Sequence, residues 1–383
     1  MIEIYNKSSL DIQAGSPDYG DLSLYAKNVY TPTEGASKLS VDNGYTVYSD
    51  GEQKILLGYT GTETKLTLPT YITQIYHFAF YNCTDITEVA IGNSVTEIGW
   101  NAFGYCSCLS EIDLGSSVSQ IDSLAFNYCS SLTRIEIPAS VVEIESSAFH
   151  ECKRLIEVCN SSSIPASSFE NGFFGIYAQH IYTPTTGTSK LSKDNDCIVF
   201  TDGEEKILIY YTGKSSNFIL PSYITKIYPW AFEDCLDLTS ITLSDRITEI
   251  GDNAFADCRN LSSVTLGSAV KTIGSKAFST CTSLKSIILP DSVTEIGDEA
   301  FAGCYYLSSV ALGSAVKTIG KNAFSCYHLN TVYYNGTAEQ WNGIDIGDGN
   351  SPLVNATIYY YSESKPTAEG NYWHYENGIP TKW

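Results

Sequence analysis

One motif of 23 residues recurs through most of the chain, and it constrains the fold more than any other feature. Each copy contains an Ala-Phe pair followed by a cysteine, and most copies have a leucine three residues later. The unit reads I-x-L-x-x-x-V-x-x-I-x-x-x-A-F-x-x-C-x-x-L. Eight cysteines keep the spacing in two groups of four: Cys83, Cys106, Cys129 and Cys152, then Cys235, Cys258, Cys281 and Cys304. A ninth copy is one residue short, so Cys326 falls one position early.

A single copy of this unit cannot form a stable domain. Its few apolar side chains bury too little surface to offset the conformational entropy lost on folding. Stacked copies share apolar faces and pair their strands, so each is stabilised by its neighbours. L-x-x-I-x-L predicts a strand, Ser-Val-x-x-Ile-Gly a turn and a second short strand, and x-x-Ala-Phe one helical turn. The sequence therefore predicts a curved, mostly β solenoid with 23-residue rungs and short helical turns.

The repeat resembles that of the BspA-like leucine-rich repeat family of microbial surface proteins. The resemblance is carried by runs such as SVTEIGWNAFGYCSCLSEIDLG and SVTEIGDEAFAGCYYLSSVALG, and it covers roughly residues 66–158 and 218–334. It implies a leucine-rich-repeat, right-handed solenoid on a secreted or cell-surface protein, often of a host-associated bacterium. It also implies a role in adhesion and protein binding.

A longer period lies above the 23-residue repeat. Tyr-Thr-Pro at 30–32 returns at 182–184, which is 152 residues later. Each half also has an insert, at 6–64 and 160–216, in which two apolar runs flank Asp-Gly, a strong hairpin signal. We therefore expect three regions: a first insert with leucine-rich repeats (1–156), a second insert with repeats (157–334) and a C-terminal β-rich cap (335–383).

Both ends of the chain carry partial or altered copies. Glu3–Ser9 resembles Glu157–Ser163, which follows the last motif residue of a repeat. We therefore expect the chain to start with the tail of a repeat whose beginning lies upstream. The pattern stops after Val332, and an aromatic-rich segment with Asn377-Gly378 follows. A terminal rung needs its open edge covered, which predicts a cap with an Asn-Gly turn, and an aromatic ligand-binding patch is the alternative.

Composition excludes several classes of protein. The chain carries 22 Lys and Arg against 43 Asp and Glu, a net charge of −21. A surface this negative repels phosphate backbones and anionic head groups, which argues against nucleic acid and membrane surfaces as partners. No apolar run reaches the roughly 18 residues of a membrane-spanning helix, and no signal peptide opens the chain. We expect an extracellular or cell-surface protein whose signal and anchor are not part of this sequence.

Residue types that carry chemistry predict no catalytic, cofactor or metal site. Nine of the twelve cysteines share one repeat position between Phe and Leu, which predicts a ladder of buried thiols rather than disulfides or metal ligands. The five histidines share no spacing, and no nucleophile elbow, phosphate loop or His-Glu-x-x-His occurs. Asp345–Asn350 lacks the spacing of a calcium loop and predicts a solvated turn.

Acidic residues recur at fixed repeat positions and are expected on the surface rather than in a catalytic pair. Thr-Glu and Lys-Thr alternate between neighbouring rungs of the second half. We therefore expect one outer edge of alternating charges, formed by Glu249, Lys271, Glu295 and Lys317. Exposed pairs of this kind contribute solubility and register.

The solvent-facing strand positions form the candidate interaction surface. In the first half they are mostly acidic, and in the second half mostly hydroxyl-bearing: Glu88, Glu111, Asp113 and Glu136, then Thr242, Thr265 and Ile288. Solenoids often bind partners on such faces, so we hypothesise that the acidic columns contact a basic partner; the alternative is that they are simply solvated. Aromatic residues form a second candidate surface, with packing as the alternative: Trp100, Tyr105, Tyr128, Trp230, Tyr305 and Tyr306.

The leading interpretation is a non-enzymatic leucine-rich-repeat protein that binds other proteins, such as host extracellular-matrix or surface proteins. The sequence leaves three alternatives open. They are a carbohydrate-binding module that uses exposed aromatic residues, a glycan-active enzyme on the carboxylate-rich face, and a purely structural spacer.

Overall fold

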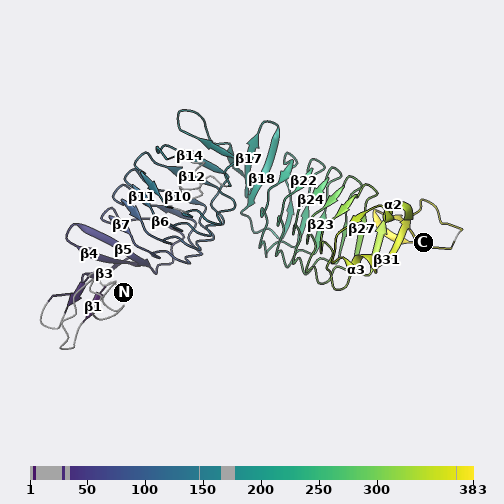
Figure 1. Cartoon of the computed structure of the whole chain (residues 1–383), viewed down its shortest axis with the longest axis horizontal. Coiled ribbons are helices and arrows are strands. Elements are labelled where there is room, and N and C mark those ends of the chain that lie inside the picture. The colour runs from purple at the N-terminus through teal and green to yellow at the C-terminus, as the bar shows by residue number, and fades with distance from the viewer. Residues whose placement is uncertain (1–2, 6–27, 31–34, 146, 165–176, 368) are drawn as a thin grey trace. The chain divides into compact units, whose positions relative to one another are not determined.

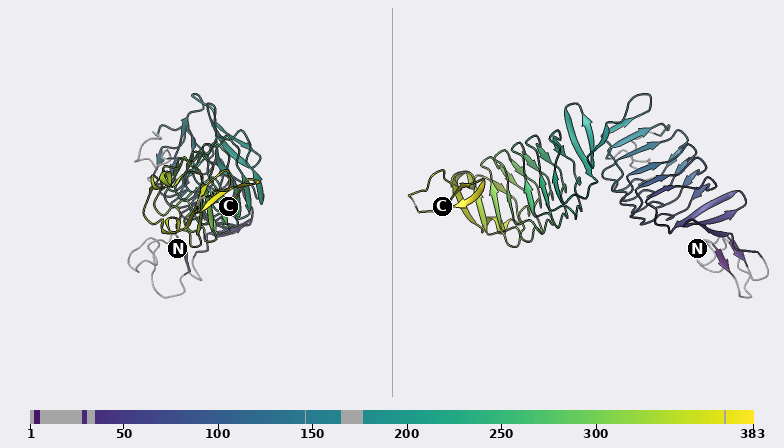
Figure 2. Two further views of the ribbon diagram at one scale, coloured as in Figure 1. Left: turned by 90° about the vertical axis from the view of Figure 1, so that its right-hand side faces the viewer. Right: turned by 180° about the vertical axis from the view of Figure 1, so that it is seen from behind.

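The computed structural model describes residues 3–5, 28–30, 35–145, 147–164, 177–367 and 369–383. In this part of the chain, strands joined by turns dominate, and two short helices lie near the C-terminus (Figure 1). The chain divides into two compact units, 1–188 and 189–383. Figure 2 shows that each unit is a stack of rungs whose strands lie side by side. The predicted β-solenoid is confirmed.

Each regular rung of the first unit contributes one strand to each of two faces. One face contains β6 (Lys65–Thr67), β8 (Glu88–Ala90), β10 (Glu111–Asp113), β12 (Arg134–Ile137) and β14 (Glu157–Asn160). The other contains β7 (Gln74–Ile75), β9 (Glu97–Ile98), β11 (Gln120–Ile121) and β13 (Glu143–Ile144). Pairing is parallel and joins residues 23 apart, such as Ile98 and Ile121. Every repeat position therefore forms a column along the stack.

The second unit repeats this arrangement. One face contains β19 (Asn217–Ile219), β21 (Ser240–Thr242), β23 (Ser263–Thr265), β25 (Ser286–Ile288), β27 (Ser309–Leu312), β29 (Thr331–Tyr334) and β31 (Thr357–Tyr361). The other contains β20 (Lys226–Ile227), β22 (Glu249–Ile250), β24 (Thr272–Ile273), β26 (Glu295–Ile296), β28 (Thr318–Ile319) and β30 (Asp345–Ile346).

The repeated phenylalanine forms a stack of buried rings in the core of each unit. In the first unit, successive ring centroids are 4.8, 5.3 and 5.0 Å apart, and the rings are within 8° of parallel: Phe80, Phe103, Phe126 and Phe149. In the second unit the spacings are 4.7, 5.0, 5.3 and 5.0 Å: Phe232, Phe255, Phe278, Phe301 and Phe324. Because this spacing matches the distance between neighbouring strands, each ring packs on the next rung at every step.

The repeated cysteine forms a second core column, and the predicted ladder of thiols is confirmed. Seven of its members are fully buried, and each donates its thiol to a phenylalanine carbonyl of the preceding rung at 3.0–3.2 Å: Cys106, Cys129, Cys152, Cys258, Cys281, Cys304 and Cys326. Cys83 and Cys235 begin the two columns and are only half-buried. All twelve cysteines are free. Burial raises the pKa of Cys106 to about 12 and raises that of Cys129 well above its ordinary value.

The Ala-Phe segment, predicted as one helical turn, consists of consecutive tight turns. The Ala102 amide donates to the Gly99 carbonyl, and Cys106 donates to Phe103. Asn101 and Tyr105 have φ values of 53° and 60°, in the left-handed region. A residue in this region cannot continue an α-helix, so the chain changes direction at both positions.

Each insert ends in the predicted Asp-Gly hairpin, which extends one sheet of its unit. The hairpins are formed by β3 (Leu39–Asp42), β4 (Tyr45–Asp50) and β5 (Gln53–Tyr59), and by β16 (Leu191–Asp194), β17 (Cys197–Asp202) and β18 (Glu205–Tyr211). β5 pairs in parallel with β7, and β18 pairs with β20. The rings of Tyr59 and Tyr211 lie 5.7 and 5.1 Å from Phe80 and Phe232. The hairpins therefore cover the start of each aromatic stack.

The resemblance between the two chain segments at 3–9 and 157–163 has a structural counterpart. β1 (Glu3–Tyr5) pairs in parallel with β2 (Asn28–Tyr30), as β14 pairs with β15 (His180–Tyr182). The remaining insert residues 6–27, 31–34 and 165–176 lie outside the described part of the chain.

The C-terminal segment adds one irregular rung and a hairpin to the second unit. α2 (Ala338–Asn342) precedes β30, and α3 (Ser351–Val354) precedes β31. β32 (Tyr372–Glu376) and β33 (Ile379–Lys382) form the hairpin, and Asn377 and Gly378 both have positive φ, as an Asn-Gly turn requires. Trp373 is fully buried and donates its indole N–H to the Tyr334 carbonyl at 3.0 Å. Its ring therefore serves packing.

The calcium-like segment 345–350 ends in a buried structural asparagine. The Asn350 side chain accepts from the Phe324 amide at 2.9 Å and donates to the Gly320 and Gly347 carbonyls at 2.8 Å each. In regular rungs a backbone carbonyl of the next rung accepts the phenylalanine amide, as Ala323 does for Phe301. Asn350 thus replaces a backbone group at the end of the regular stack.

The predicted edge of alternating charges in the second unit is wrong. Glu249 pairs with Thr272, and Glu295 pairs with Thr272 and Thr318. Lys271 instead lies in the neighbouring column, because it follows Glu249 by 22 residues rather than 23. At this edge the Lys226 Nζ lies 2.9 Å from a carboxylate oxygen of Glu205 and 3.7 Å from one of Glu249.

Candidate functional site

The acidic columns of the first unit lie on the face formed by β8, β10 and β12. Parallel pairing places Glu88 beside Glu111 and Ala90 beside Asp113. Glu136 follows Asp113 by one 23-residue step, on β12. Glu111, Asp113 and Glu136 are exposed, and Glu88 is half-buried. The structure thus brings the four predicted acids onto one strand-lined face.

Two of these acids already have basic partners. Lys65 on β6 donates to the Glu88 carboxylate, and this hydrogen bond raises the pKa of Lys65. The Arg134 guanidinium lies 3.3 Å from a carboxylate oxygen of Glu136 and 3.4 Å from one of the fully buried Glu157. Arg134 also donates to the Tyr182 hydroxyl, which ties β15 to the repeats.

Glu111 and Asp113 lie at the centre of the face, where Lys65 attracts Glu111 at longer range without forming an ion pair with it. Asp113 accepts a hydrogen bond from the backbone amide of Gly115 at 2.8 Å, which fixes the position of its carboxylate. Among the described residues, no ion pair engages Glu111 or Asp113. Their negative charge is therefore available to a cation from outside the chain.

The corresponding face of the second unit is uncharged at the same positions. Thr242 and Thr265 are exposed and lie side by side on β21 and β23. Ile288, one step further on β25, is 38% exposed. Ala311, which pairs with Ile288, is buried next to Tyr333, so the solvated column ends there. Two units of one fold thus present an acidic and a neutral version of the same face.

Exposed aromatic rings of the first unit form a continuous ladder at the turns between the two strand faces. The Phe78 ring lies 4.6 Å from Trp100 and 5.3 Å from Tyr81. Tyr105 lies 5.5 Å from Tyr81 and stacks on Tyr128 at 4.8 Å. All five rings are 38–44% exposed. The predicted residues Trp100, Tyr105 and Tyr128 therefore belong to one surface.

Sequence reasoning missed Phe78 and Tyr81 in this ladder. They align with Asn101 and Gly104 one repeat later, so neither column is aromatic throughout. The ladder crosses columns diagonally, and only the ring positions reveal it. Trp230, another of the predicted aromatic residues, belongs to the second unit and is half-buried.

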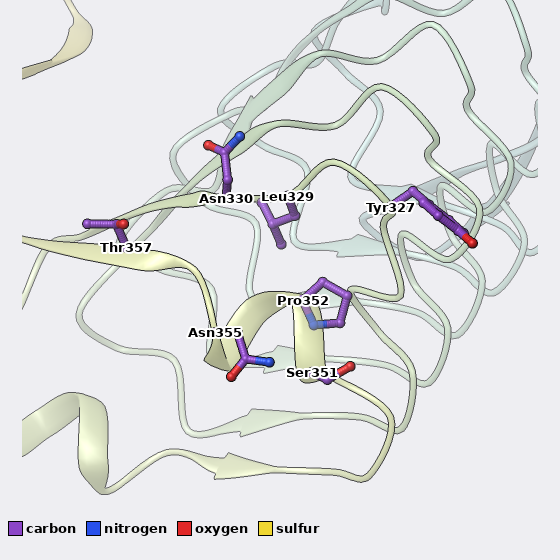
Figure 3. Close-up of a pocket in the computed structure, with 7 residues that line it drawn as sticks. All are labelled: Tyr327, Leu329, Asn330, Ser351, Pro352, Asn355 and Thr357. Carbon is purple, nitrogen blue, oxygen red and sulfur yellow. The ribbon is translucent and has the colours of Figure 1, made fainter.

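A second exposed aromatic group borders an open pocket in the second unit. Tyr305 lies 5.0 Å from Tyr306 and 5.9 Å from Tyr327. The pocket has a volume of about 370 Å³ and lies between the loop after Cys326 and α3 (Figure 3). Its lining is Tyr327, Leu329, Asn330, Ser351, Pro352, Asn355 and Thr357. The repeat pattern does not single out Tyr327, because the ninth rung is one residue short and its columns are displaced.

The described residues contain no group of three or more His, Cys, Asp or Glu side chains arranged to hold a metal ion. In the same part of the chain, no helix is long and apolar enough to cross a membrane.

A comparison with protein families finds a known repeat in the parts of the chain that form the rungs. Residues 58–174 and 206–330 match the model described as BspA type leucine rich repeat region, in six copies. The chain belongs to this family. The resemblance found in the sequence, and the leucine-rich-repeat solenoid that it implied, are therefore confirmed. A search of curated proteins finds no match.

Solved structures similar to this BspA-type chain include bacterial proteins described as leucine-rich. A leucine rich cell surface protein from Faecalibacterium prausnitzii is 26% identical, with a TM-score of 0.46, and the match covers 81% of this chain and 98% of that one. The pneumococcal vaccine antigen PcpA is 20% identical, with a TM-score of 0.46 and coverage of 86% and 94%. A Bacteroides ovatus leucine-rich repeat protein is 22% identical, with a TM-score of 0.33 and coverage of 85% and 99%.

Proposed function

We propose that the chain is a non-enzymatic, cell-surface or secreted binding protein whose first unit contacts a basic protein partner. The observation that carries this proposal is the pair Glu111 and Asp113, exposed and without an ion-pair partner among the described residues. Opposite charge on a partner speeds association and selects the orientation of binding. A host extracellular-matrix or surface protein with a basic patch is the expected class of partner.

The aromatic ladder supplies the second element of the proposed surface. Tyrosine and tryptophan are enriched among the residues that dominate binding energy, because large rings bury much apolar area with little loss of side-chain entropy. Ring contacts between neighbours already fix the orientation of Tyr105 and Tyr128. A partner that covers the ladder therefore meets preorganised rings.

The rigid stack explains how such a surface is held without a deep pocket. Glu111 and Asp113 lie on β10, which pairs in parallel with β8, and the phenylalanine and cysteine columns fill the interior. Partner binding along the strand-lined face then requires little reordering of the scaffold, which reduces the entropic cost of association.

The experiment is a binding screen of the whole chain against immobilised, deglycosylated extracellular-matrix and host-surface proteins. The test variant combines Glu111→Ser and Asp113→Thr, the residue types at the matching column positions, Ser263 and Thr265, of the second unit. The control combines Glu295→Thr and Asp345→Thr. It removes the same number of charges from β26 and β30, which lie in the second unit.

We expect at least one basic protein to bind, with an affinity that falls as the salt concentration rises. Its affinity for the test variant should be lower by about tenfold or more, because the variant lacks the carboxylates that pair with the partner's basic groups. The control variant should bind as the unaltered chain does. Equal affinity of all three proteins, or no binding by any basic protein of the panel, would contradict the proposal.

A further inference from the structure

The pocket at the end of the second unit is lined entirely by residues other than Asp, Glu, Lys, Arg and His. In a chain with a net charge of −21, an uncharged pocket selects strongly against ionic ligands. An anion would lack a cationic partner there, and a cation would lack a carboxylate. The chemistry of the lining therefore favours a neutral, polar ligand.

The pocket results from a break in the repeat. Cys326 follows Cys304 by 22 residues, one fewer than the regular spacing. The next rung then replaces the Ala-Phe turn with α3, whose Leu353 is buried while Ser351 and Val354 are exposed. In regular rungs the loop after the cysteine packs against the equivalent loop of the next rung. The Ser283 amide, for example, donates a hydrogen bond to the Arg259 carbonyl of the preceding rung. The loop of Tyr327–Asn330 lacks such a copy and borders open space.

The polar groups of the lining are free to bind a ligand. Ser351, Asn355 and Thr357 are exposed, and within the described chain no hydrogen bond engages their side chains. The Asn330 side-chain oxygen accepts from the Thr331 hydroxyl at 2.8 Å, which leaves the Asn330 amide N–H groups as donors. Amides and hydroxyls both donate and accept, so they match a ligand that carries several hydroxyl groups. Figure 3 shows these side chains on both sides of the opening.

An exposed aromatic platform adjoins these polar groups. The Tyr327 side chain is 86% exposed, and Tyr305 and Tyr306 next to it are 46% and 56% exposed. The His328 ring is nearly parallel to Tyr306, at 6.3 Å, and lies edge-on to Tyr305 at 4.9 Å. A cluster of rings this exposed is not explained by core packing. The apolar C–H face of a sugar ring can cover such a surface while its hydroxyls reach the amides.

We infer that this pocket binds one neutral sugar ring of a glycan, with Tyr327 as the stacking surface and Asn330 and Asn355 as hydrogen-bond partners. Pockets for small ligands span roughly 300–1,000 Å³, and a pocket of 370 Å³ is at the small end of that range. Tyr327 itself is 86% exposed, so its ring is accessible to such a ligand. The inference concerns the second unit and does not depend on protein binding by the first.

The test uses the whole chain on an array of free neutral hexose and N-acetylhexosamine oligosaccharides, with sialylated and sulfated oligosaccharides as anionic counterparts. Isothermal titration with the strongest neutral binder then compares the unaltered chain with Tyr327→Ala and Asn355→Ala. Both residues are exposed, so both variants should fold and melt as the unaltered chain does. Tyr71→Ala, which removes an exposed tyrosine of the first unit that lies outside the aromatic ladder, is the matched control.

We expect binding of at least one neutral oligosaccharide, a loss of affinity of tenfold or more in Tyr327→Ala, a smaller loss in Asn355→Ala, and no change in Tyr71→Ala. The inference is overturned by an array without neutral binders, by a preference for anionic oligosaccharides, or by a loss of affinity that is the same in Tyr71→Ala as in Tyr327→Ala.

Discussion

Replacing Phe278 with alanine removes a ring from the middle of the aromatic stack of the second unit. The side chain is fully buried, and its ring lies 5.0 Å from Phe255 and 5.3 Å from Phe301. Truncation of a buried phenylalanine costs about 3–5 kcal/mol in unfolding free energy. Each aromatic contact adds about 0.5–1.5 kcal/mol beyond burial, so we expect a loss near the upper end, about 4–5 kcal/mol.

Phe324→Ala supplies an internal comparison. Phe324 is equally buried, but among the residues that the structure describes it stacks on one ring only, Phe301 at 5.0 Å. Its truncation should therefore cost about 1 kcal/mol less than that of Phe278, the value of one aromatic contact. Tyr306→Ala, at a 56% exposed side chain, should change stability by less than about 0.5 kcal/mol.

Urea denaturation of the whole chain, followed by far-ultraviolet circular dichroism, measures these differences. With a denaturant dependence of roughly 2–3 kcal/mol per molar, the unfolding midpoint of the second unit should fall by about 1.3–2.5 M in Phe278→Ala. A loss below about 1.5 kcal/mol for Phe278→Ala, or a larger loss in Phe324→Ala, would refute the reasoning that each rung is held by both neighbours.

Two further predictions concern the thiol column. Burial raises the pKa of Cys106 to about 12, whereas the unfolded thiol titrates near 9. The folded state therefore holds a proton that the unfolded state loses, and stability should fall as pH rises above about 9, by roughly 1 kcal/mol for Cys106 at pH 10. Urea midpoints of unfolding at pH 8 and pH 10 measure this loss of stability. The midpoint should fall less between the two pH values in Cys106→Ala than in the unaltered chain, and an equal fall would contradict the prediction. Second, titration of unreduced protein in denaturant should find twelve free thiols, and in native buffer the exposed Cys108 should react first; fewer than nine free thiols would contradict the ladder.

The regular part of the fold could be predicted because one spacing governs it. A constant 23-residue step places Phe103 beside Phe126 and Glu88 beside Glu111, so side-chain columns can be read directly from the sequence. The exposure of the acidic positions follows from the two-residue alternation of strands. These inferences need no knowledge of tertiary contacts beyond the repeat itself.

The rest depended on departures from that spacing. Lys271 follows Glu249 by 22 residues, and this single-residue difference moves it to another column. The contact between Phe78 and Trp100 joins different columns, because side chains at tight turns can cross between rungs. The pocket beside Tyr327 arises where the ninth rung loses one residue and α3 replaces a turn. A repeat pattern predicts where such breaks occur but does not predict their geometry.

Carboxyl footprinting of the chain, alone and saturated with a basic partner found in the screen, tests the proposed binding surface most directly. The proposal predicts that Glu111 and Asp113 lose most of their labelling when the partner binds, while Glu295 and Asp345 label at unchanged rates. Unchanged labelling of Glu111 and Asp113, or protection confined to the second unit, would contradict it.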